Sequence, residues 1–122
     1  MGNKPISISG GQVLGDCLIR HQVNTTFCVP GESYLAVLDS LFEKKNEIQI
    51  VNARHEAGAS NMAEAYGKLT GNPGVAFVTR GPGACHASVG VHIAKQDSTP
   101  MILFVGQVPR NVLGREAFQE MN

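Results

Sequence analysis

Four short apolar runs without a charged residue alternate along this chain with segments in which apolar residues recur at helical spacing. The runs cover residues 23–29, 48–51, 75–79 and 101–105, and each predicts a buried strand. Because the runs are continuously apolar and do not alternate with polar residues, they are typical of a parallel sheet that is covered on both faces. We therefore predict an α/β fold with helices on both faces of the sheet, within the one domain that 122 residues suit.

Four helices are predicted between these strands. Ser9 should cap the first, which runs to about residue 21, and Glu32 and Ser33 should begin the second. Glu56 opens the third, and the fourth covers residues 84–95. The positions expected to face inward from the third helix are Met62, Ala65, Tyr66 and Leu69. Residues 1–8 are predicted to be a tail, and the weak apolar pattern after residue 110 predicts an architecture that is truncated at its C-terminus.

Composition excludes several classes of function. The 10 basic and 10 acidic side chains balance, so no basic stripe is available for a nucleic-acid backbone. No apolar run approaches the ~20 residues that a membrane span needs. The three cysteines contain no Cys-x-x-Cys pair and indicate free thiols in a reducing compartment. His55, His86 and His92 lack the spacing that places two ligands on one helix face, so no metal cluster is predicted.

Polar and glycine-rich segments follow each of the predicted strands. They are Pro30-Gly31-Glu32, residues 52–56, residues 79–83 and Gly106-Gln107. The carboxyl ends of parallel strands meet at one edge of a sheet, and ligands of such sheets bind beyond that edge. These four segments are therefore predicted to form one candidate site.

Two features of this edge have competing interpretations. Glu56 is either a helix-start carboxylate, which the helix dipole stabilises by roughly 0.3–1 kcal/mol, or a partly buried acid with a raised pKa that shares a proton with a ligand base. Gly81-Pro82-Gly83 either cradles a phosphate or forms a simple strand-to-helix turn. It is not a dinucleotide fingerprint, because the third glycine of that pattern is replaced by His86.

The order of several short motifs resembles a known enzyme family. The motifs are Val29-Pro30-Gly31, Arg54-His55-Glu56, Ala63-Glu64-Ala65-Tyr66, Thr70-Gly71, Gly81-Pro82-Gly83, Asp97-Ser98-x-Pro100, Gly106-Gln107-Val108-Pro109 and Ala117-Phe118-Gln119-Glu120. Together they are similar to the N-terminal, pyrimidine-binding domain of thiamine-diphosphate-dependent enzymes, acetolactate synthases in particular. The resemblance covers residues 9–122 and implies most of a three-layer, flavodoxin-like domain.

The resemblance also implies roles for individual residues. Glu56 would hydrogen-bond the aminopyrimidine of thiamine diphosphate and so activate the cofactor toward a 2-oxo acid. Pro30, Gly31, Pro82 and His86 would lie at the cofactor, and Glu32, Phe118 and Gln119 on the substrate side. Glu32 stands where the synthases usually have a glycine, and His86 where they have an asparagine. These two departures leave open whether the reaction is that of a synthase, a decarboxylase or a lyase.

The family resemblance implies partners that this chain does not carry. The diphosphate and Mg²⁺ would be held by a second domain, and the site would be shared between subunits of a homodimer or homotetramer. A cytoplasmic location is expected, without nucleic-acid or membrane partners. A fragment of such an enzyme is one hypothesis, and a free-standing, non-catalytic α/β binding or regulatory module is the other. A flavodoxin-like nucleotide-binding domain is the weakest, because no nucleotide fingerprint is present.

Overall fold

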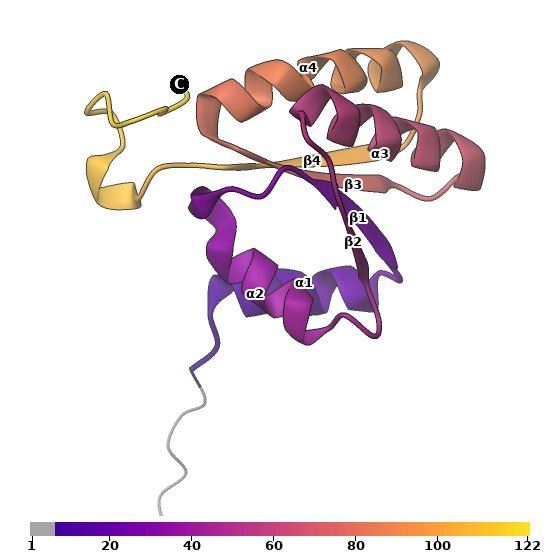
Figure 1. Cartoon of the computed structure of the whole chain (residues 1–122), viewed down its shortest axis with the longest axis horizontal. Helices are drawn as coiled ribbons and strands as arrows, with labels where there is room; N and C mark the ends of the chain where they lie inside the picture. The colour runs from indigo at the N-terminus through magenta and orange to yellow at the C-terminus, as the bar shows by residue number, and fades with distance from the viewer. Residues whose placement is uncertain (1–6) are drawn as a thin grey trace, which may run out of the picture.

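A computed structural model describes residues 7–122, and it has the α/β architecture that the sequence predicts (Figure 1). The helices are α1 (Gly10–Arg20), α2 (Leu35–Glu43), α3 (Glu56–Thr70) and α4 (Arg80–Asp97), with short 3-10 turns η1 (Glu32–Tyr34) and η2 (Arg110–Val112). The strands are β1 (Thr25–Cys28), β2 (Gln49–Asn52), β3 (Gly74–Thr79) and β4 (Met101–Gly106). The tail predicted for residues 1–8 falls mostly outside the described residues.

The four strands form one parallel sheet in the order β2-β1-β3-β4. Helices α1 and α2 cover one face, and α3 and α4 cover the other (Figure 1). The chain leaves β1 toward β2 through α2 and leaves β3 toward β4 through α4, so the connections diverge between β1 and β3. The crevice at such a point of divergence is where ligands of open α/β sheets bind.

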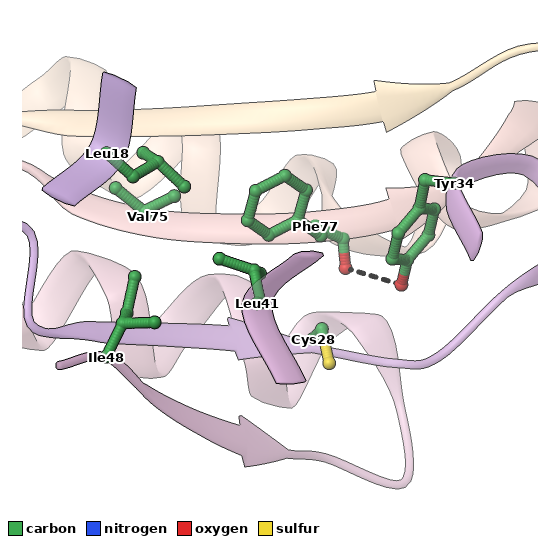
Figure 2. Close-up of a cluster of buried hydrophobic side chains, with 7 residues drawn as sticks. All are labelled: Leu18, Cys28, Tyr34, Leu41, Ile48, Val75 and Phe77. Atoms are coloured by element: carbon green, nitrogen blue, oxygen red, sulfur yellow. Dashed lines mark hydrogen bonds between the residues drawn. The ribbon is translucent and has the colours of Figure 1, made fainter. Parts of the chain in front are cut away.

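The core on the α1–α2 face is built from large side chains. Its buried members are Leu18, Cys28, Tyr34, Leu41, Ile48, Val75 and Phe77 (Figure 2). The Phe77 ring stacks on Phe104 at 4.9 Å between centroids and on Tyr34 at 5.8 Å. These aromatic contacts connect β4, β3 and η1, the turn that follows the β1 loop of the predicted candidate site.

In the core on the α3–α4 face, the buried apolar residues that α3 contributes are small. Ala59, Ala63 and Gly67 recur every four residues along α3 and are all buried. A Cβ added at Gly90 of α4 would lie 2.5 Å from Ser60 Oγ and 2.6 Å from the Ser60 carbonyl carbon. The glycine therefore lets the two helices approach closely.

Two local predictions were wrong. Leu69 and Ala65 are exposed, Leu69 to 85 %, because the small residues of α3 form its inward face and Leu69 lies almost opposite Gly67 on the helix. The fourth helix begins at Arg80, so Gly81-Pro82-Gly83 is its first turn and not a loop before it. The second helical segment begins at Glu32 and Ser33 as predicted, first as η1 and then as α2.

Ser9 caps α1 as predicted, and the cap is reciprocal. The amide of Gln12 donates to Ser9 Oγ at 3.1 Å, and the Ser9 amide donates to Gln12 Oε1 at 2.8 Å.

Across residues 7–122, no helix combines the length and the apolar character that crossing a bilayer requires.

Candidate functional site

The loop after β1 is pressed against the end of β3. A Cβ on Gly31 would lie 2.5 Å from Thr79 Cβ, so only glycine allows this approach. Ser33 Oγ and Thr79 Oγ1 share a hydrogen bond, and a Cβ at Gly106 would collide with the Ser33 side chain. The carboxyl ends of β1, β3 and β4 therefore converge, as the sequence predicts.

Tyr34 lies close to carbonyl groups of two of these converging segments. Its hydroxyl donates to the carbonyl of Val29, the residue before Pro30, and lies 3.4 Å from the carbonyl oxygen of Phe77 in β3. Burial raises the pKa of the Tyr34 hydroxyl well above its ordinary value, and the nearby charges of Cys28 and Glu56 raise it further. The phenol therefore keeps its proton and stays a donor at neutral pH.

Glu56 opens α3 at the same edge of the sheet. His55 is the N-cap of α3, and its Nδ1 accepts the amide of Ala57 at 3.1 Å. The Glu56 side chain is 14 % exposed, and its Oε2 lies 3.0 Å from His86 Nδ1. The carboxylate therefore lies mostly covered between α3 and α4 and does not point into bulk water.

His86 completes a cluster that sequence spacing does not reveal. Its half-exposed ring stacks on His55 at 4.6 Å between centroids and 28° between planes. One ligand atom each from His55, Glu56 and His86 can be chosen so that all lie within 4.8 Å of one another. The sequence offered no signal for this, because His86 comes 30 residues after Glu56, on another helix.

Arg80 is a residue of the site that sequence reasoning missed. Its Nη1 lies 3.3 Å from Glu32 Oε1 and 3.5 Å from the carbonyl oxygen of Phe118, and its side chain is 12 % exposed. Its φ of 50° lies in the left-handed region, a conformation that costs energy for a residue with a Cβ. Its position directly after a buried strand was the available signal.

The C-terminal segment folds back onto this edge, beside the start of α4 (Figure 1). The Gly81 amide donates to the Gln119 carbonyl at 2.9 Å, and Gln107 Nε2 donates to the Met121 carbonyl at 2.6 Å. The backbone of Phe118 and Gln119 thus joins the site, while the Phe118 side chain is 74 % exposed.

The structure brings most of the predicted site residues into two connected groups. Glu32, Arg80 and the backbone of Phe118 and Gln119 form one group around the first turn of α4. Glu56 at the start of α3 and His86, further along α4, form the other. Pro30 and Pro82 are exposed at the same edge, Pro82 in the first turn of α4.

Comparison with known proteins identifies the domain. Residues 8–122 match the family described as "Thiamine pyrophosphate enzyme, N-terminal TPP binding domain". The acetolactate synthase large subunit of Parasynechococcus marenigrum (strain WH8102) is 42% identical over 120 residues, which are 97% of this chain and 19% of that protein. The mitochondrial acetolactate synthase catalytic subunit of Saccharomyces cerevisiae (strain ATCC 204508 / S288c) is 39% identical over 115 residues, 94% of this chain and 17% of that protein.

A third similar protein comes from another organism. Acetolactate synthase of Arthrospira platensis is 41% identical over 117 residues, 94% of this chain and 20% of that protein. The chain thus spans about a fifth of the length of these relatives. The match over residues 8–122 shows that the chain belongs to the family of N-terminal TPP-binding domains of thiamine pyrophosphate enzymes, and the chain is similar to this part of acetolactate synthases.

Proposed function

We propose that this chain is the pyrimidine-binding part of a thiamine-diphosphate-dependent enzyme that acts on 2-oxo acids, by carboligation as in acetolactate synthase or by decarboxylation. The observation that carries the proposal is the placement of Glu56. Its carboxylate lies mostly covered at the first turn of α3, at the ligand-binding edge of a parallel sheet. The names of the relatives, all acetolactate synthases, support the reaction class.

The residues at this edge fit an aminopyrimidine ring. Gly31 has no side chain and packs directly against Thr79, which holds the β1 loop at this edge of the sheet, where its backbone groups would meet a flat ligand. Among residues 7–122, His86 is the hydrogen-bond partner of the Glu56 carboxylate and engages Oε2. Oε1 is therefore left for a ring nitrogen, and Pro82 and Pro30 offer apolar surface nearby.

When bound, thiamine diphosphate would supply the electron sink for the bond cleavage in the 2-oxo acid. Glu56 would hold a proton at Oε1 and share it with the ring nitrogen, because the covered site keeps competing water away from the carboxylate. His86 Nδ1 would orient the carboxylate by holding Oε2. Arg80 would keep Glu32 and the Phe118–Gln119 backbone in place on the substrate side.

Several parts of the proposal concern what lies outside this chain. The diphosphate and its Mg²⁺ would be held by another domain, and the site would be completed by a second subunit of a homodimer or homotetramer. The cytoplasmic location remains a prediction, since the relative from S. cerevisiae is named as mitochondrial.

Deuterium exchange at C2 of the bound cofactor tests the role of Glu56. In the longer enzyme that the proposal requires, Glu56→Gln is expected to slow exchange by ~10²-fold or more, the usual contribution of a positioned acid or base. Glu43→Gln, an exposed carboxylate at the end of α2, is the matched control and should leave exchange unchanged.

Exchange that is equally fast in Glu56→Gln would remove Glu56 from this role. A calorimetric titration of the chain alone supplies the second readout. It should detect weak cofactor binding and no turnover, and tight, Mg²⁺-dependent binding would contradict the placement of the diphosphate site on another domain.

A further inference from the structure

The cluster of His55, Glu56 and His86 has the composition of a transition-metal site. We propose that these three side chains bind Zn²⁺, with two imidazole nitrogens and one carboxylate oxygen as ligands. Zinc binding by these residues is separate from the proposed cofactor chemistry and does not depend on that chemistry. Two histidines and one glutamate form a ligand set that proteins use for zinc with a fourth position open to water.

The distances favour a cation between α3 and α4. Tetrahedral zinc with bonds of about 2.0–2.1 Å places its ligand atoms roughly 3.3 Å apart. His86 Nδ1 and Glu56 Oε2 already lie 3.0 Å apart, so a cation can replace the proton that these two atoms share. The imidazole proton of His86 then moves to Nε2, which stays free to carry it.

His55 supplies the third ligand after a small rearrangement. Its ring stacks on His86, and the ligand atoms of the three residues lie within 4.8 Å. Both histidines are exposed, so their rings can turn toward the cation without repacking a core. If Nδ1 of His55 turns toward the metal, it releases the Ala57 amide, so α3 loses one N-cap hydrogen bond. The free energy of zinc binding to protein ligands far exceeds the loss of one such bond.

Zinc at this site would also affect the cofactor, a consequence that rests on the proposed function. A carboxylate that coordinates zinc cannot share a proton with the cofactor ring. Zinc and the aminopyrimidine should therefore compete for Glu56, and bound cofactor should weaken zinc binding by the same factor by which zinc weakens cofactor binding.

Cobalt provides a direct probe of this site, because Co²⁺ takes the same ligands as Zn²⁺ in tetrahedral sites and absorbs visible light. The purified chain is titrated with Co²⁺ at pH 7.5 in a Cys85→Ser background, which removes the exposed thiol beside His86. Visible bands of a tetrahedral complex should saturate at one equivalent, and Zn²⁺ should abolish them by displacement. This readout involves neither cofactor nor turnover, so it can fail while the proposed function stands, and the reverse also holds.

Variants assign the ligands. His86→Asn, His55→Asn and Glu56→Gln should each weaken Co²⁺ binding by at least ~10-fold, the effect seen when even the hydrogen-bond partner of a ligand is removed. His55→Asn retains a good N-cap residue, so α3 should still form. The control is His92→Asn, an exposed histidine of α4 outside the cluster, and far-UV circular dichroism checks the fold of each variant.

Two results would overturn the proposal. One is the absence of tetrahedral Co²⁺ bands in the Cys85→Ser chain. The other is an affinity that is the same in the cluster variants as in His92→Asn.

Discussion

Removal of one hydroxyl group tests how the ligand-binding edge is held together. Tyr34 is 7 % exposed, and its hydroxyl connects the end of β1 with β3 through the carbonyls of Val29 and Phe77. Tyr34→Phe deletes this connection and keeps the ring that stacks on Phe77. The change therefore isolates the polar contact from the packing.

The expected cost follows from the two carbonyl groups involved. A net hydrogen bond contributes about 0.5–1.5 kcal/mol, and a buried acceptor left without a partner costs about 1–3 kcal/mol. The Val29 carbonyl loses a close donor, whereas the longer 3.4 Å contact to Phe77 contributes little. We expect Tyr34→Phe to lower the free energy of unfolding by roughly 1–2.5 kcal/mol.

Urea denaturation followed by circular dichroism measures this difference, with an unchanged m-value as the sign that two-state unfolding is retained. Tyr66→Phe is the matched control, since its hydroxyl donates at 2.9 Å to Asn24 Oδ1 in an exposed position. It should cost less than about 0.5 kcal/mol. Equal losses in the two variants would refute the assignment of Tyr34 as the anchor of the β1 loop.

The pKa of Tyr34 adds a pH dependence with a definite sign. The pKa is raised in the folded state, from an ordinary value of 10.0, mainly by burial. The unfolded chain therefore releases the phenolic proton at a lower pH than the folded chain does. The contribution of Tyr34 to stability is complete below pH 10 and is lost as the pH rises further. Tyr34→Phe should accordingly lose less stability than the wild type on going above pH 10.

Two further predictions concern the core. In the folded chain at pH 8, the exposed thiols of Cys17 and Cys85 should react quickly with a thiol reagent. Cys28 should react slowly, because it is buried and burial raises the pKa of its thiol to about 11. Fast reaction of all three thiols before urea is added would contradict this arrangement. Gly90→Ala should destabilise the chain by about 1–3 kcal/mol in thermal unfolding, because the added Cβ forces α4 away from α3. Gly58→Ala is the control, since its Cβ would lie 3.8 Å from the nearest neighbour. This control should be neutral or stabilising by up to about 1 kcal/mol.

Structural features that depend on residues close together in the sequence were predicted correctly. The uncharged runs identified all four strands and their parallel arrangement, and Ser9 was correctly placed as the cap of α1. The order of the motifs identified the family, which the comparisons confirm. Errors arose where packing overrode local preference, as at Leu69, which is exposed because α3 turns its small residues toward the sheet.

In the candidate site as well, some features follow from the local sequence and others depend on how the chain folds. The residue pattern was enough to predict that an acid, Glu56, opens a helix at the carboxyl edge of a parallel sheet, because strand period, cap residues and helix starts are local properties of the chain. The partners of Glu56 depend on tertiary contacts. His86 reaches Glu56, and Arg80 reaches Glu32 and the Phe118 carbonyl, across separations of 30 to 48 residues. Such contacts depend on how helices and loops pack over the sheet, and no spacing rule along the chain encodes that packing.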